Sequence, residues 1–315
     1  MKPPSTQDTN NQKNGNKPPF SVSSHFPGGF GFGFGGAKTT DVETLHQVSQ
    51  PGDVVFFGVD IEFNRLFGDH NPGAATFTRE NTFCMMPWTQ SCAAPCHDIG
   101  LVAADSADAA MQGVHIISKH LATIGRRPAL VGCDHTASLA CASGIADASK
   151  EPITYLYLDA HFDLGLHSET PALHNGNFVG RLLKMERIQR VVNVGGRCLS
   201  MYVPIYRSVP GFACIPGGVN HSKTGPILDQ LSWLKGSPLY VSIDADVLDP
   251  SCAPNVCCQE PFGMSAVELF GICAWLGKSC TVLGADLCEI LPSSQSLRSE
   301  QVLMRCLHAL FPKTR

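Results

Sequence analysis

The sequence predicts an α/β fold, a three-layer αβα sandwich in which helices cover both faces of a mostly parallel sheet. From Gln50 onward, short apolar runs of strand length alternate with segments of helical spacing. Within these runs successive residues are apolar and do not alternate with polar ones, which is typical of parallel strands that are buried on both faces. Acidic and imidazole side chains follow several of these runs, at the strand ends where ligands bind on sheets of this kind.

The individual elements follow from the spacing of the apolar residues. A strand is predicted over Val54–Asp60, and a polar loop region is expected from Asn71 onward. Apolar residues at helical spacing then predict a helix over residues 104–121. Further strands are predicted over residues 129–133, 153–160, 191–194, 239–246 and 282–287, and helices over 136–148, 178–187, 265–276 and 300–310. Ser265 with Glu268 three positions later is typical of a helix that begins with a capping box.

The chain divides by composition into a leader and one globular domain. Residues 1–17 are rich in Asn, Gln, Lys and Pro, and residues 27–36 alternate Phe with Gly. Such a segment buries too little apolar surface to offset the entropy lost on ordering, so we expect residues 1–40 to be a disordered leader. A docking tail is the alternative that the Phe-Gly alternation leaves open. No internal repeat divides the rest, so we expect one catalytic domain over residues 45–312.

The bulk composition excludes two classes of partner. The formal net charge is −4 and the pI is near 6.3, so the chain lacks the basic surplus that binding to nucleic acid requires. No uninterrupted apolar run reaches the roughly 18 residues of a membrane-spanning helix. The 14 cysteines are scattered through apolar segments, and the N-terminal residues lack the layout of a secretory signal. These features predict a cytoplasmic protein with mostly buried thiols.

Acids and imidazoles follow four of the predicted strands. They are Asp134 and His135, then Asp159, His161 and Asp163, then Asp244 and Asp246, and finally Glu289. Residues two positions apart in an extended chain project to the same side, so Asp159 and His161 can point together. In a parallel sheet all four strand ends meet at one edge, and these side chains are then expected to converge there.

Such a cluster predicts bound cations. Several carboxylates buried together repel one another and are costly to desolvate, and divalent cations offset that cost. Two metal ions about 3.5–4 Å apart need both bridging and terminal ligands, which this many acids and imidazoles can supply. Two His with several Asp suit Mn²⁺, whereas a structural zinc ion more often recruits thiolates.

These segments resemble those of the arginase and agmatinase (ureohydrolase) family of binuclear manganese enzymes, over residues 50–310. The resembling motifs are Gly132-Cys-Asp-His135, Asp159-Ala-His-Phe-Asp163, Ser242-Ile-Asp-Ala-Asp-Val-Leu-Asp-Pro250 and Pro72-Gly73-Ala74, with Glu289 where the family has an active-site glutamate. The resemblance implies an arginase/deacetylase-like fold and two Mn²⁺ ions in each chain. It also implies a homo-oligomer, a trimer or a hexamer.

The resemblance also implies a role for each residue of the site. One ion is held by His135, Asp159, Asp163 and Asp244, and the other by Asp159, His161, Asp244 and Asp246, so that Asp159 and Asp244 bridge the two. Asp163 is expected to pass a proton to the departing amine. His174 is expected to shuttle protons, with His167 of the same loop as a competitor for that role. Glu289 is expected to pair with the guanidinium of the substrate.

The implied activity is that of a hydrolase that cleaves a guanidino group into urea and an amine. The sequence departs from the family pattern at Cys133, in the loop over residues 253–260, and in the loop after Asp163, where residues for the α-amino and α-carboxylate groups of free arginine are not evident. Agmatine, a guanidino acid, free arginine and a peptide-embedded arginine therefore all stay open as substrates. Hydrolysis of formimidoylglutamate is the alternative within the fold, although Gly165 stands where that subgroup commonly has arginine. A metal-binding pseudoenzyme that acts as an interaction protein is the alternative from another class.

Overall fold

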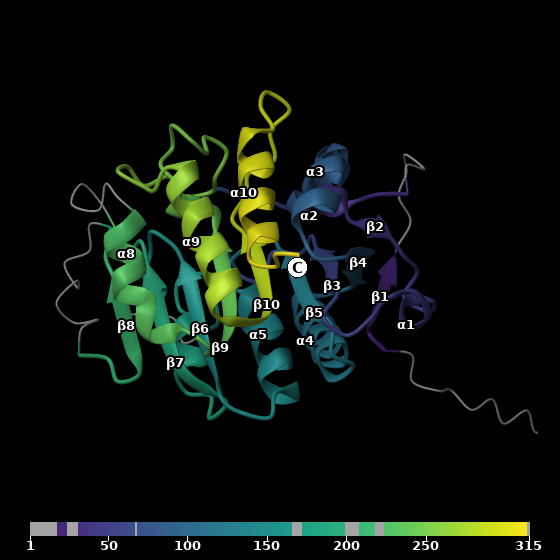
Figure 1. Cartoon of the computed structure of the whole chain (residues 1–315), viewed down its shortest axis with the longest axis horizontal. Coiled ribbons are helices and arrows are strands. Elements are labelled where there is room, and N and C mark those ends of the chain that lie inside the picture. Colours follow the sequence, from purple (N-terminus) through teal and green to yellow (C-terminus); the bar gives the residue numbers. More distant parts are fainter. Residues whose placement is uncertain are drawn as a thin grey trace, which may run out of the picture.

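A computed structural model of the chain describes residues 18–23, 31–66, 68–165, 172–198, 208–217 and 224–313. Its centre is a ten-stranded sheet with the order β1-β4-β3-β5-β10-β9-β6-β7-β8, to which β2 is added beside β4 (Figure 1). The strands are β1 (Phe20–Ser23), β2 (Lys38–Thr39), β3 (Val54–Val59), β4 (Cys96–Ala104), β5 (Arg127–Val131), β6 (Ile153–Leu158), β7 (Ile188–Val194), β8 (Phe212–Ile215), β9 (Pro238–Asp244) and β10 (Thr281–Cys288). Within the described ranges every named strand pair is parallel except β1 with β4.

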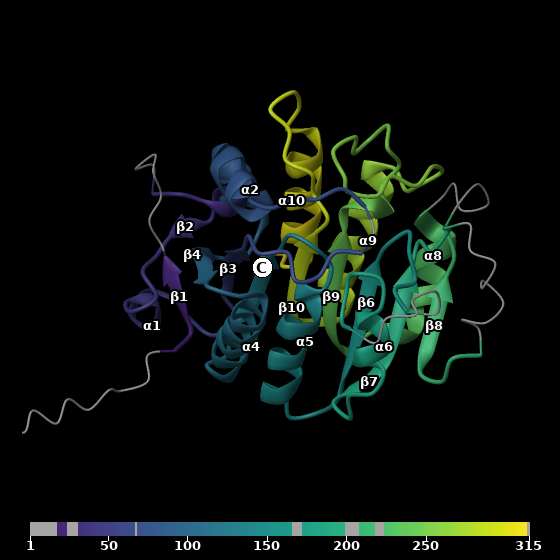
Figure 2. The same cartoon turned by 180° about the vertical axis from the view of Figure 1, so that it is seen from behind.

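Helices cover both faces of the sheet, which confirms the predicted three-layer sandwich. The α-helices are α1 (Leu45–Val48), α2 (Ala74–Thr82), α3 (Met86–Cys92), α4 (Ala107–Thr123), α5 (Ala137–Ala148), α6 (Phe178–Leu182), α8 (Thr224–Leu231), α9 (Ala266–Ser279) and α10 (Arg298–Ala309), and four 3-10 turns are η1 (Phe34–Gly36), η2 (Phe83–Met85), η3 (Ser232–Leu234) and η4 (Ala245–Val247). Figure 1 shows α9 and α10 on one face, and Figure 2 shows α4, α5 and α6 on the other. Among the residues placed in the structure, no helix is both long enough and apolar enough to cross a membrane.

The core consists of two apolar layers, one on each face of the sheet. Strand β6 shows how a continuous apolar run serves both: Leu156 and Leu158 pack with α9 and α10, whereas Tyr155 and Tyr157 pack with α4 and α5. This is the period of two expected of a strand that is buried on both faces.

Most predicted elements are confirmed within a few residues. The capping box at the start of α9 is present, with Ser265 Oγ accepting from Glu268 N–H and the Glu268 side chain accepting from Ser265. Two predictions need correction. The predicted helix over residues 178–187 ends at Leu182, because the chain turns there into β7. The polar loop region expected from Asn71 contains α2, α3 and β4.

A buried ion pair explains why β4 and α2 were missed. Arg79 Nε of α2 lies 2.7 Å from Asp98 Oδ2 of β4, and both side chains are at most 3% exposed. Each charge interrupts the apolar pattern of its own segment. Burial of either charge alone would cost several kcal/mol, and the pairing of the two offsets that cost.

The prediction of disorder for residues 1–40 is wrong where the structure describes that segment. Strand β1 pairs with β4, and Phe34 is fully buried, with its ring stacked on Phe56 at 6.4 Å. The glycines beside Phe34 allow a close approach of the backbone: a Cβ at Gly33 would lie 1.6 Å from Asp98 Oδ2, and Gly35 has φ 52°. Residues 1–17 and 24–30 lie outside the described part of the chain.

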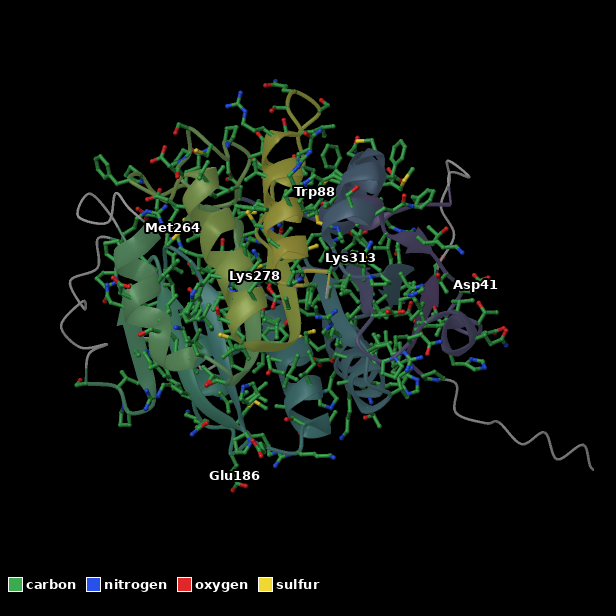
Figure 3. All side chains as sticks on the ribbon, in the orientation of Figure 1. Asp41, Trp88, Glu186, Met264, Lys278 and Lys313 are labelled. Atoms are coloured by element: carbon green, nitrogen blue, oxygen red, sulfur yellow. The ribbon has the colours of Figure 1, made fainter. Side chains whose placement is uncertain are left out.

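The segment around Phe34 and Gly35 contacts the helices on one face of the sheet. Gly35 N–H donates to Thr82 Oγ1 at 2.8 Å, and the carbonyl of Gly35 accepts from Thr89 Oγ1 at 2.5 Å. His308 Nε2 of α10 lies 3.2 Å from the same carbonyl oxygen. Trp88 of α3, which is labelled in Figure 3, contributes to this layer. Its ring lies 6.0 Å from the His308 ring.

Candidate metal centre

The candidate site residues lie at the carboxyl ends of the four central strands of the sheet. Strands β5, β10, β9 and β6 are neighbours in that order (Figure 2). The register pairs Leu287 with Val131 and with Ile243, and pairs Ile243 with Leu158. Four parallel strands therefore end at nearly the same level, and the residues that follow them share one site.

The first group of ligands surrounds His135. Its Nδ1 atom lies 3.0 Å from Asp244 Oδ2, 3.1 Å from Asp159 Oδ2 and 3.3 Å from Asp163 Oδ2. The His135 side chain is 1% exposed, and that of Asp159 is fully buried. One nitrogen and three carboxylate oxygens thus face a common point from three different strand ends.

The second group surrounds His161. Its Nδ1 atom lies 2.9 Å from Asp246 Oδ2 and 3.6 Å from Asp159 Oδ1. Asp159 therefore turns one oxygen to each histidine, which is the geometry of a residue that bridges two neighbouring cations. Asp244 directs its Oδ2 atom at the His135 group, and its Oδ1 atom accepts from the backbone N–H of Asp246, a member of the second group, at 2.9 Å.

The structure thus brings together all six residues that the sequence offered as metal ligands. It also adds Cys288, whose sulfur lies within 4.8 Å of ligand atoms of His135 and Asp244. Cys288 is the last residue of β10 and reads in the sequence as one more apolar residue of a buried strand, so no sequence signal singles it out.

The donor set fits a divalent cation. Within the described ranges, His135 Nδ1 and Asp159 Oδ2 are buried polar atoms without a hydrogen-bond partner, although they lie only 3.1 Å apart. Ser242 Oγ donates to Asp286 Oδ1 at 2.7 Å and lies 2.8 Å from His135 Nε2, so it accepts the proton of that nitrogen. Nδ1 is then the nitrogen that faces the carboxylate oxygens, and it can share with them either a proton or a divalent cation.

The electrostatics of the cluster support the same conclusion. Burial and the charge of Asp159 raise the pKa of Asp163 to about 6. Burial, together with Asp246 and Asp159, raises the pKa of Asp244 well above its usual range. Burial opposes ionisation of Asp159 too, but the two histidines outweigh it and lower that pKa. The carboxylates cannot all ionise side by side without a compensating positive charge.

Two backbone positions at the site are left-handed. Asp163 has φ 48° and Glu289 has φ 63°, a region that residues other than glycine seldom adopt. Such strain persists where the surroundings fix the backbone, and it is frequent at functional sites. At Glu289 the surrounding contacts are clear, because its N–H donates to Cys133 O at 2.8 Å and its carbonyl accepts from Cys257 N–H at 3.0 Å.

Glu289 is held between two partners. Its Oε1 atom accepts from the His135 backbone N–H at 2.8 Å, and its Oε2 atom lies 2.7 Å from Arg65 Nη1. Burial raises the pKa of Glu289 to about 7, although Arg65 acts in the opposite direction. Sequence reasoning missed Arg65, which lies in a loop after β3. The sequence feature that could have indicated Arg65 is the pair of opposite charges, Glu62 and Arg65, that follows a buried strand.

The proposed proton shuttle, His174, lies in the loop before α6. It is 1% exposed, its backbone N–H donates to Asn177 Oδ1 at 2.9 Å, and its Nδ1 atom accepts from Gly176 N–H at 3.1 Å. Burial lowers the pKa of His174. Its competitor His167 lies outside the described residues, so the choice between them stays a prediction.

Comparison with known proteins identifies a family whose members resemble this chain. The Arginase family profile matches residues 74–310. Arginase 1, mitochondrial, from Arabidopsis thaliana is 28% identical over 54% of this chain and 49% of that protein. Guanidinobutyrase from Pseudomonas aeruginosa is 24% identical over 82% of this chain and 86% of that protein. The chain spans about half the length of several curated relatives, including the Arabidopsis arginase.

Solved structures share the fold. A Trypanosoma cruzi formiminoglutamase variant with Mn²⁺ superimposes with a TM-score of 0.72 at 19% identity, over 86% of this chain and 96% of that one. The profile match covers more than half of the chain and includes all four strand ends that carry the His and Asp cluster. The protein described here is therefore a member of the arginase family.

Proposed function

We propose that this protein is a manganese-dependent amidino hydrolase that cleaves a guanidino group into urea and an amine. The observation that carries the proposal is the position of Asp159 between two histidines, with Oδ2 at 3.1 Å from His135 and Oδ1 at 3.6 Å from His161. A carboxylate shared in this way supports two adjacent cation positions, which is the arrangement used for hydrolysis at binuclear sites.

The chain's own residues would divide between the two positions. His135, Asp159, Asp163 and Asp244 would hold one Mn²⁺ ion, and Asp159, His161, Asp244 and Asp246 the other. Oxygen and imidazole donors suit manganese, and the structural relative from Trypanosoma cruzi was solved with that metal. When bound, the pair of ions would make water reactive at neutral pH and polarise the trigonal carbon of the substrate.

Three residues, one of which is also a metal ligand, would act on the substrate. Glu289 would pair with the guanidinium, because a carboxylate matches that planar cation in charge and shape. Asp163, within 3.3 Å of His135, would pass a proton to the departing amine. His174 would relay protons through its Nε2 atom, since Nδ1 accepts from Gly176.

One observation favours a second candidate, a formimidoylglutamase-type C–N hydrolase. Arg65 places a cation beside Glu289, and formimidoylglutamate, which carries carboxylates, needs a cation in its binding site. A formimidoylglutamase from Halalkalibacterium halodurans is 32% identical over 53% of this chain and 54% of that protein. A metal-binding protein without hydrolytic activity is the third possibility that the experiment below distinguishes.

The test is product release by protein stripped with EDTA and reloaded with Mn²⁺. Agmatine, 4-guanidinobutyrate, arginine, an arginine-containing peptide and formimidoylglutamate would each be assayed for urea and for formamide. Urea from at least one guanidino compound, only in the presence of metal, is expected, and Asp246→Asn should abolish it. Formamide without urea supports the second candidate. Neither product from any compound would overturn both hydrolase proposals.

The family and the cysteines bear on assembly and location. We infer a homo-oligomer, a trimer or a hexamer, from membership of the family, and light scattering on purified protein would measure it. A cytoplasmic location is supported by the cysteines, because those with a described side chain are free thiols. For the catalytic domain we retain the end at residue 312. Its start moves toward the N-terminus, because residues 31–40 pack on the same core.

A further inference from the structure

We propose that Arg65 is a specificity-determining residue: an internal guanidinium that occupies Glu289 and that a guanidino substrate has to displace. The inference rests on the proposed function, because it assigns the same carboxylate to the substrate. It goes beyond that function in naming a competitor for the binding position within the chain itself.

The guanidinium of Arg65 is enclosed by acceptors. Nη1 lies 2.7 Å from Glu289 Oε2, Nε lies 2.9 Å from Glu62 Oε1, and Nη2 lies 2.8 Å from Asn71 Oδ1. The side chain is only 1% exposed. These contacts reproduce what a binding site for a guanidinium ligand has to provide, namely planar hydrogen bonding to a buried carboxylate.

Glu289 carries a single negative charge, so a second guanidinium placed beside Arg65 would meet like-charge repulsion. One oxygen accepts from the His135 N–H and the other is taken by Arg65. Because His135 also faces three carboxylates of the metal centre, Glu289 lies directly beside the proposed site of hydrolysis. A substrate guanidinium that pairs with Glu289 must therefore replace Arg65, and its apparent affinity is reduced by the fraction of molecules in which Arg65 is in place.

Glu62 gives Arg65 a second carboxylate to which it can move. Its side chain is 16% exposed, against 5% for Glu289, and it already contacts Arg65. Glu62 Oε2 lies 2.6 Å from His70 Nδ1, so its two oxygens are shared between partners near the surface. If Arg65 leaves Glu289, its charge stays paired, which lowers the free-energy cost of the exchange.

The backbone that carries Arg65 is held by single side-chain contacts. We define the Arg65 segment as residues 61–66, which contain neither helix nor strand. Phe63 N–H donates to Asp134 Oδ2 at 2.7 Å, and Leu66 N–H donates to Asn175 Oδ1 at 3.0 Å. The Leu66 side chain is 49% exposed. Ile61 and Phe63 pack against the core, but the segment has no ladder hydrogen bonds, so it opens at a lower free-energy cost than a strand or helix does.

The first experiment measures binding of guanidinium chloride and agmatine to the Mn²⁺-loaded protein by titration calorimetry. Arg65→Ala should lower the dissociation constant of both by about tenfold or more, because the internal competitor is gone. Arg65→Lys is the matched control that keeps a cation near Glu289, and it should stay close to the wild type. The added substitution Glu289→Gln in the Arg65→Ala protein should cancel the gain. Equal or weaker binding by Arg65→Ala would overturn the proposal.

The second experiment needs no variant, so it decides the matter even if Arg65→Ala does not fold. Hydrogen exchange at the amides of Phe63 and Leu66 should become several-fold faster when agmatine is added to the wild type. Unchanged exchange at saturating agmatine contradicts displacement. Tighter guanidinium binding without urea release keeps the Arg65 assignment and rejects the hydrolase. Urea release with unchanged guanidinium binding and unchanged hydrogen exchange keeps the hydrolase proposal and rejects the Arg65 assignment.

Discussion

His135 donates its Nε2 proton to Ser242 Oγ at 2.8 Å, and this contact fixes which nitrogen faces the metal centre. The Ser242 hydroxyl in turn donates to Asp286 Oδ1 at 2.7 Å, and Asp286 is 1% exposed. A buried carboxylate thus orients the histidine through a hydroxyl group, and the lone pair of Nδ1 is directed at Asp159, Asp163 and Asp244.

Removal of this hydroxyl should weaken metal binding. We expect Ser242→Ala to lower the affinity for Mn²⁺ by about 10–100-fold, because His135 loses the contact that fixes its tautomer. Competition with a fluorescent chelator would measure the change. Ser138→Ala removes a buried hydroxyl 3.3 Å from Ser242 Oγ and should have a smaller effect. Wild-type affinity in Ser242→Ala would show that the contact does not orient the ligand.

The two ligand groups should lose their ions separately. Asp246 contacts His161 but lies outside the His135 group, so Asp246→Ala should bind about one metal ion fewer per chain. Elemental analysis after gel filtration would give the count. Asp249→Ala is the control, because that carboxylate accepts from Ser251 and Gly263 instead of joining the cluster. Two ions bound to Asp246→Ala would refute the assignment.

The buried pair of Arg79 and Asp98 should be important for stability. Arg79→Met leaves a fully buried carboxylate without its cation, and we expect it to lower the free energy of unfolding by about 3–5 kcal/mol. Urea denaturation monitored by circular dichroism would measure the loss. The double variant Arg79→Met with Asp98→Leu should recover part of it, since no isolated charge then remains. A double variant less stable than Arg79→Met would argue against this explanation.

His308 should make the fold sensitive to acid. Burial lowers its pKa to about 4, below the usual 6.5. The unfolded chain therefore binds more protons between these values, and stability is lost as the pH falls from about 6.5 to 4. The full difference corresponds to roughly 3 kcal/mol. Melting temperatures of the wild type and His308→Gln should converge across this range. The exposed His46→Gln is the control, and an unchanged gap for His308→Gln would contradict the prediction.

Sequence patterns were sufficient wherever the signal is local. The run Tyr155–Leu158 predicts a buried strand because every residue is apolar, and Asp159 and His161 follow it at the spacing that projects both to one side. Ser265 and Glu268 predict the start of α9 because a capping box involves only four successive residues. In each case the interacting atoms are separated by a few bonds along one element.

The pattern failed where a residue is explained only by a distant partner. Asp98 and Arg79 read as solvent-exposed charges until they are seen to neutralise each other. Phe34 reads as part of a glycine-rich leader until Phe56 and α10 are seen to cover it. Composition averages over a segment, whereas burial is decided by the particular surface that the segment meets.

The sequence by itself determined the parallel sheet and the convergence of acids and imidazoles at one of its edges, because strand polarity and residue spacing are properties of the local chain. Only the tertiary structure decided that Arg65 pairs with Glu289, 224 positions away, and that Cys288 joins His135 and Asp244. Those contacts depend on where loops and neighbouring strands lie in space, which no local period encodes. They act directly beside the proposed chemistry, so they bear on which substrate the site accepts.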